Sequence, residues 1–298
     1  MTATHTPPRS AGFGPAGPGL AGTTRRVTRP AIRWDLAIAL ATTVLFAVAA
    51  VWPQLVATHN PFAMDLPASL QPPSPAHWFG TDEAGRDLYS RVVYGTRESL
   101  GIGIGAALVS LSLAIVLGTV AALGGRVASA VVGWLLEVAF SFPALLLSLL
   151  LIAVLGPSAL TQILAVGIGT APGYARMVRG QILAAKDSAY VEAAVALGHS
   201  RGRILRRHIL PNALRPLVAV FALSIGQSIV WASSLSFLGL GVAPPSPEWG
   251  ALLDAGRAFI TEAGWLTVIP GLVIVLLALT ATTLGRHLQR FLEKGETA

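Results

Sequence analysis

The most restrictive feature of this sequence is a set of long stretches that contain no Asp, Glu, Lys or Arg. Each is longer than the roughly 20 residues that a helix needs to cross a bilayer. The stretches are Leu36–Met64, Ser99–Gly125, Val138–Ala175, Pro216–Pro247 and Ala263–Gly285. Only 12% of the 298 residues are charged, against about 25% in soluble domains. The sequence therefore predicts an all-α polytopic membrane protein.

Hydropathy and turn residues together predict about six transmembrane helices in a membrane domain over residues 31–298. Gly156-Pro157-Ser158 divides one long apolar run into two spans, because Gly and Pro mark turns. The expected spans are 34–57, 98–124, 129–155, 159–180, 215–240 and 264–286. Residues 1–30 are rich in Pro, Gly, Thr and Arg, a composition that predicts a disordered cytoplasmic tail.

The basic residues predict the orientation of the chain in the membrane. With the N-terminus inside, the 21 Lys and Arg residues all fall on the cytoplasmic side except Arg86, Arg91, Arg97 and Arg257. We therefore expect both termini in the cytoplasm, an external segment at 58–97 and a basic cytoplasmic segment at 181–214, in a plasma (inner) membrane protein. The net charge of +7 is spread between the apolar spans. We accordingly expect lipid, and no nucleic acid, as a partner.

The cytoplasmic segment is too basic for the lipid and too regular to be disordered. Asp187 or Ser188 can cap a short helix, and Gly198 is placed to end it in a left-handed cap. Ser200 can cap a second helix, which we expect Pro211 and Pro216 to end.

Glu192-Ala193-Ala194, followed by Gly198 and then Leu210-Pro211, resembles the EAA motif of ABC importer permeases. The surrounding residues are similar to the dipeptide/oligopeptide/nickel family, as are the strings His77–Asp87, Leu235–Val242 and Trp265–Gly271. The resemblance covers nearly everything beyond residue 30. It implies a C-type permease, the inner membrane component of a binding-protein-dependent system, with a type I importer (MetI-like) fold. The residues that it assigns to coupling with an ATPase are Tyr190, Glu192, Ala193, Ala194, Gly198, Leu210 and Pro211.

The same resemblance implies the partners and the cargo. A second homologous permease, two cytoplasmic ATPases and an external solute-binding protein would complete an ATP-driven importer, most simply of di- or oligopeptides. Nickel, a metal chelate or another small solute is the alternative cargo. No phosphate-binding loop occurs in the sequence, so we expect ATP and Mg²⁺ to be bound by the partner ATPases. In this chain itself we expect no enzyme activity, catalytic residue, cofactor or metal, and spacing identifies no substrate ligand.

Other classes of protein remain as alternatives. An ion-coupled secondary transporter generally has buried ionisable groups and inverted repeats; Glu137 is the one acid well inside an expected span. A membrane scaffold or receptor would use the basic segment only for docking. The chain also departs from the family pattern at Trp134, Glu137, Ala171 and Ala232.

Two further patterns have structural explanations. Gly80-Thr-Asp-Glu-Ala-Gly-Arg-Asp87 mixes acids with an arginine, which predicts a charge-paired turn. The glycines of Gly101–Gly105 and Gly167–Gly169 predict close packing between helices.

Overall fold

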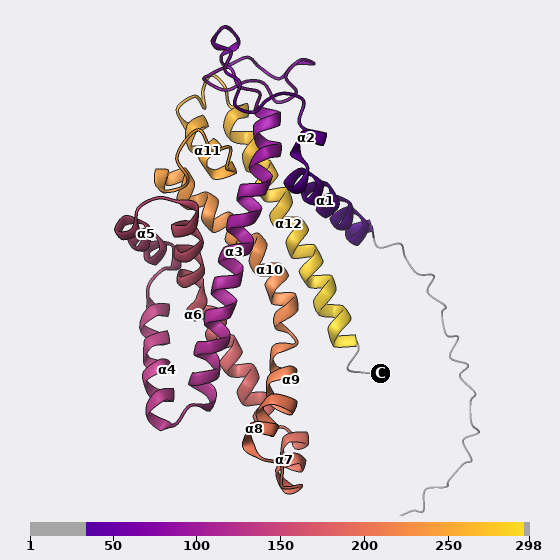
Figure 1. The fold of residues 1–298 in the computed structure, drawn as a ribbon, viewed down its shortest axis with the longest axis vertical. Coiled ribbons are helices and arrows are strands. Elements are labelled where there is room, and N and C mark those ends of the chain that lie inside the picture. The colour runs from indigo at the N-terminus through magenta and orange to yellow at the C-terminus, as the bar shows by residue number, and fades with distance from the viewer. Residues whose placement is uncertain (1–33, 295–298) are drawn as a thin grey trace, which may run out of the picture. The chain divides into compact units, whose positions relative to one another are not determined.

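The computed structural model describes residues 34–294, and the predicted tail lies outside this range. The described residues form helices joined by loops, without a strand (Figure 1). The α-helices are α1 (Trp34–Val51), α2 (Pro53–Val56), α3 (Leu88–Leu123), α4 (Arg126–Ser141), α5 (Ala144–Leu155), α6 (Ala159–Lys186), α7 (Ala189–Ala196), α8 (Arg201–Ile204), α9 (Leu210–Leu214), α10 (Leu217–Leu235), α11 (Trp249–Arg257) and α12 (Trp265–Lys294). A 3₁₀ turn covers Leu66–Ala68, and π turns cover Leu205–Ile209 and Ser236–Leu240.

The apolar helices of the described residues account for four or five of the about six predicted spans. Four helices, α1, α3, α10 and α12, are long and apolar enough to cross a membrane, and the α4–α5 pair makes a fifth if it counts as one span. Helix α6 occupies the fourth expected span and continues to Lys186, but it is less apolar and is not one of the four.

The expected span over 129–155 is divided into two helices in the structure. Helices α4 and α5 meet at an angle of 93°. The bend lies at Phe142, which is extended (φ −86°, ψ 135°) immediately before Pro143. The ring of a proline disfavours the helical conformation of the residue before it. Pro143 therefore divides an apolar run that contains no charge.

Helix α3 lies at the centre of the helix packing, against α6, α10 and α1. The glycines of the predicted packing motifs permit this contact. A Cβ at Gly103 would lie 2.1 Å from Ile229, and one at Gly167 would lie 2.6 Å from Val109. The prediction that these glycines serve helix packing is confirmed at those positions, whereas Gly101 has open space around it.

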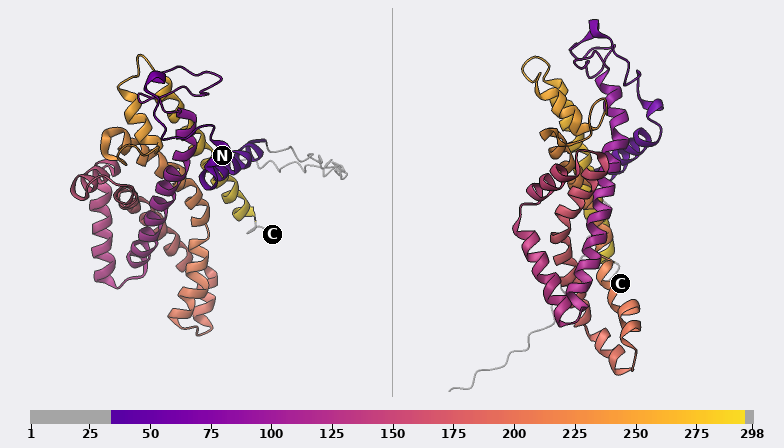
Figure 2. Two further views of the ribbon diagram at one scale, coloured as in Figure 1. Left: turned by 45° about the horizontal axis from the view of Figure 1, so that its top comes forward. Right: turned by 60° about the vertical axis from the view of Figure 1, so that its left-hand side comes forward.

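The loop between α2 and α3 and the short helix α11 lie together at one end of the helix packing, and α7 and α8 lie at the other (Figures 1 and 2). Trp249 at the start of α11 is fully buried, and its indole N–H donates to Val92 of α3 at 2.9 Å. Glu248 accepts hydrogen bonds from the N–H groups of Gly250 and Ala251. Burial raises the pKa of the Glu248 carboxyl, and these hydrogen bonds oppose the rise.

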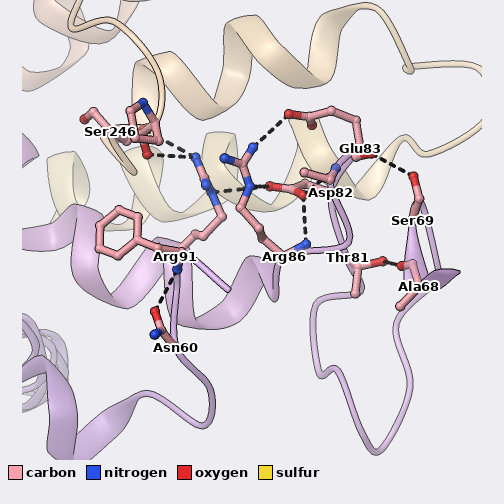
Figure 3. A network of polar contacts seen from close by, with 12 residues as sticks. Asn60, Ala68, Ser69, Thr81, Asp82, Glu83, Arg86, Arg91 and Ser246 are labelled. Atoms are coloured by element: carbon pink, nitrogen blue, oxygen red, sulfur yellow. Dashed lines mark hydrogen bonds and ion pairs between the residues drawn. The ribbon is translucent and has the colours of Figure 1, made fainter. Parts of the chain in front are cut away.

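The charge-paired turn predicted for residues 80–87 is confirmed (Figure 3). Asp82 lies between two arginines, 2.7 Å from Arg86 and 3.5 Å from Arg91, and Arg86 also reaches Glu83 at 2.8 Å. Arg91 donates onward to the carbonyl of Ser246 at 3.4 Å. Helix α3 begins at Leu88, well before the expected span start at residue 98, and its first charged residue, Arg91, is paired within this cluster.

Candidate coupling site

Helix α7 places most of the predicted coupling residues on one short segment. Glu192 and Ala193 are exposed, and Tyr190 is 42% exposed. Ala194 points the other way and is only 3% exposed. The structure therefore brings Tyr190, Glu192 and Ala193 together at the surface and uses Ala194 as an anchor.

The end of α7 forms a Schellman motif, as the position of Gly198 predicts. The N–H of Gly198 donates to Val195, and the N–H of His199 donates to Ala194 at 3.1 Å. Gly198 has a φ of +75° and open space beyond its Cα. A side chain there would fit sterically, but the left-handed backbone favours glycine. The requirement for glycine is therefore conformational.

Two side chains fix α7 to the helices of the membrane domain. Val191 and Ala194 belong to a buried apolar cluster that includes Val178 and Ile182 of α6, Ala121 of α3 and further residues of α4, α8, α9 and α10. Sequence reasoning missed Val191 as an anchor, although it lies three residues before Ala194 and on the same helix face. Packed side chains of this cluster therefore link α7 with helices that include α3 and α6.

Leu210 and Pro211 follow in an unusual helical path. The expectation that Pro211 and Pro216 end the second helix is confirmed for Pro216, since α9 ends at Leu214. It is wrong for Pro211, because the chain continues through a π turn at Leu205–Ile209 into α9. In the π turn, the N–H of Leu210 donates to the carbonyl of Leu205. This wider turn accommodates a proline that an α-helix interior would reject. Leu210 packs against the same buried cluster as Val191.

An open groove of about 510 Å³ lies beside α7. Its lining combines the end of α3 at Leu123 and Gly124 with Val195 of α7 and Ile204 and Leu205 of the following segment. The exposed apolar side chains Val195 and Leu197 continue this surface, at 60% and 75% exposure. The arginines of α8 and the π turn are exposed beside it.

A second cavity, of about 520 Å³, lies at the α4–α5 bend. Phe142 and Pro143 line it together with Tyr174 of α6 and Trp231 of α10. The Tyr174 hydroxyl donates to the side-chain oxygen of Gln227 at 2.8 Å, which gives the apolar cavity one polar pair. Sequence reasoning missed the bend that forms this cavity. Its signal is Ser141-Phe142-Pro143, which lies in a run without charged residues.

The departures from the family pattern lie in different environments. Ala171 and Ala232 are buried at 2% and 3% exposure, so small side chains fit there. Trp134 and Glu137 are exposed on α4. Glu137 is therefore not a buried ionisable group inside the helix packing of this chain.

The fold is that of a polytopic helical membrane protein. The short helices α7 and α8, with the arginines of α8 and the π turn, lie at one end of the membrane domain. The fold is similar to a solved amino acid ABC transporter chain, with a TM-score of 0.56 and 17% identity over 67% of this chain and 93% of that chain. It is also similar to the inward-facing MetNI methionine ABC transporter, with a TM-score of 0.55 and 19% identity over 67% of this chain and 95% of that chain.

Residues 114–294 match the model of the family described as "Binding-protein-dependent transport system inner membrane component". The chain belongs to this family and is an ABC importer permease.

Three curated relatives illustrate the match. The probable D,D-dipeptide transport system permease protein DdpC of Escherichia coli is 40% identical over 84% of each chain. The dipeptide transport system permease protein DppC of Alkalihalophilus pseudofirmus is 38% identical over 79% of this chain and 78% of the relative. The glutathione transport system permease protein GsiD of Pectobacterium atrosepticum is 37% identical over 90% of each chain.

Proposed function

We propose that this chain is the permease subunit of an ATP-driven importer of short peptides. The relatives that cover most of its length are named for transport of D,D-dipeptides, dipeptides and glutathione, and all of these are short peptides. The chain would form half of the translocation pathway, paired with a second homologous permease. An external solute-binding protein would deliver the peptide, and both termini would lie in the cytoplasm.

Helix α7 is the proposed contact with a cytoplasmic ATPase subunit. One observation carries this assignment: a helix with an exposed face of small side chains is anchored to the membrane helices by Val191 and Ala194. Ala193 leaves room for a partner surface to approach the backbone closely. Glu192 in the first turn favours the helix because an acid complements the positive end of the helix dipole.

The coupling would proceed by rigid displacement. When ATP closes the two ATPases, the ATPase that contacts this chain would move α7. The buried cluster around Val191 would pass that movement to α3 and α6. ATP and Mg²⁺ would be bound by the ATPases. Such coupling needs an element whose position both sites influence. In this protein α7 would be that element.

The cavity at the α4–α5 bend is the proposed part of the translocation surface in this chain. Its aromatic and aliphatic lining suits peptide side chains, and the Tyr174–Gln227 pair offers hydrogen-bonding groups to a peptide backbone. A cavity open on one side suits a pathway that two permease subunits share.

Purification of the assembly from its native membrane tests the proposal. Recovery of ATPase subunits, a second permease and a peptide-binding protein, with peptide-stimulated ATP hydrolysis after reconstitution, is the expected result. Transport by this chain alone, driven by an ion gradient, would instead support a secondary carrier.

A further inference from the structure

Three metal-ligating side chains meet where the loop after α2 reaches the start of α3. They are His59, His77 and Asp87, and one ligand atom of each lies within 4.8 Å of the other two. The Nδ1 atom of His77 is 2.9 Å from the Asp87 carboxylate, and that of His59 is 3.7 Å away. The two imidazole rings lie side by side, with centroids 4.9 Å apart.

The backbone of each ligand is held in place independently of any ion. The His59 N–H donates to the Ser90 hydroxyl at 2.9 Å. Asp87 caps α3 by accepting from the Ser90 N–H at 2.8 Å through Oδ2, which leaves Oδ1 directed toward the histidines. The His77 N–H donates to the Ser74 hydroxyl at 3.1 Å. Ordering the loop around an ion would therefore cost little further conformational entropy.

The site is closed on one side and open on the other. The side chain of Asp87 is 1% exposed, that of His77 is 20% exposed and that of His59 is 44% exposed. A cavity of about 450 Å³ adjoins His59 and is lined by Asn60, Phe62 and Tyr94 among others. An ion could enter through this cavity and keep a water molecule on its open side.

The ligand atoms indicate the kind of ion. Imidazole nitrogens suit Zn²⁺ and related transition metals, whereas Ca²⁺ and Mg²⁺ prefer oxygen ligands. Bonds of about 2.0–2.1 Å in a tetrahedral site put neighbouring ligand atoms about 3.3 Å apart. The two ligand distances to Asp87, 2.9 and 3.7 Å, lie on either side of that value. Small side-chain rotations would close the site.

We propose that His59, His77 and Asp87 bind one divalent transition-metal ion of the zinc class, with water as the fourth ligand. The Thr58 hydroxyl lies 3.0 Å from His59 Nδ1, within hydrogen-bonding distance. The metal replaces this contact and the His77–Asp87 hydrogen bond. Its effect is to fasten the loop between α2 and α3 onto the first turn of α3.

Metal titration of the full-length protein, purified without a polyhistidine tag, tests this site. Calorimetry with Zn²⁺ and visible absorption with Co²⁺ are the two probes. We expect one equivalent per chain, with an intense tetrahedral Co²⁺ band. His59→Ala should weaken Zn²⁺ binding more than about tenfold and abolish the band. This variant leaves the Asp87 cap in place.

A matched control separates this site from other histidines. His199 stacks on His208 at the other end of the molecule, with ring centroids 5.9 Å apart. We expect His199→Ala to bind Zn²⁺ like the original protein. His77→Ala is the second test variant. Absence of a bound equivalent, or an equivalent that persists unchanged in both His59→Ala and His77→Ala, would overturn the proposal.

Discussion

The two ends of the membrane domain are held by different kinds of interaction. At the α2–α3 loop, Asp82 and Arg86 are both nearly buried and are joined at 2.7 Å within a network that reaches Ser246 near α11. At α7, the anchors are the apolar side chains Val191 and Ala194 and a backbone cap at Gly198. The first arrangement fixes a loop, whereas the second holds a short helix with an exposed face. Stability and coupling should therefore respond to mutations at different ends.

The largest effect on stability is expected at the buried ion pair. Asp82→Ala leaves Arg91 without its paired carboxylate, although Arg86 keeps Glu83, and an uncompensated buried charge costs about 3–5 kcal/mol. The thermal unfolding midpoint in detergent should fall by about 10 °C.

Glu83→Ala is the matched control, because its side chain is 35% exposed where it meets Arg86. We expect a loss below about 1 kcal/mol. Equal shifts for the two variants would contradict the claim that burial of the ion pair stabilises this loop.

Substitution of Gly198 is expected to lower the free energy of unfolding less than Asp82→Ala does, but to abolish function. Gly198→Val places a β-branched side chain at a φ of +75°, which costs about 1–2 kcal/mol and unwinds the end of α7. Peptide-stimulated ATP hydrolysis in the reconstituted assembly should be lost while the unfolding midpoint changes little. Gly198→Asn should retain most activity, since asparagine tolerates this conformation. Similar activity in the valine and asparagine variants would show that the cap is not required.

The smallest effect on the fold is expected from Glu192→Lys. The exposed acid in the first turn of α7 contributes less than about 1 kcal/mol to the helix, so assembly of this chain in the membrane should be unchanged. The lysine would nevertheless present a positive charge to the ATPase where the original protein presents a negative one. ATPase recovery on co-purification should fall with Glu192→Lys and should fall less with Glu192→Gln. Undiminished recovery with the lysine variant would place Glu192 outside the contact.

Local patterns in the sequence predicted the end of α7 well. A glycine after an apolar helical run predicted the left-handed cap at Gly198, and the observed hydrogen bonds of Val195 and Ala194 match it. The helical path through Pro211 was not predictable by the same rule. A π turn shifts the hydrogen-bonding register before the proline, and no local residue pattern signals such a turn.

Tertiary contacts explain the other differences. Arg91 and the charges that follow it placed the start of the second span near residue 98, but the structure pairs Arg91 with Asp82 and begins α3 at Leu88. Pro143 is the sequence signal for the α4–α5 bend, but it lies within an uninterrupted apolar run that predicts one continuous span. His59, His77 and Asp87 lie 18 and 10 positions apart at no recognisable ligand spacing, and the folded loop brings them together.

Cross-linking from α7 tests the central claim most directly. The natural sequence contains no cysteine, so Ala193→Cys introduces a single reactive thiol on the exposed face of α7. Ala63→Cys, exposed in the loop between α2 and α3, is the control. With a short thiol-directed cross-linker in native membranes, we predict that Ala193→Cys forms an adduct with the ATPase subunit whose yield changes on ATP addition, and that Ala63→Cys forms none. An ATPase adduct from Ala63→Cys, or none from Ala193→Cys in an assembly that still hydrolyses ATP, would contradict the account.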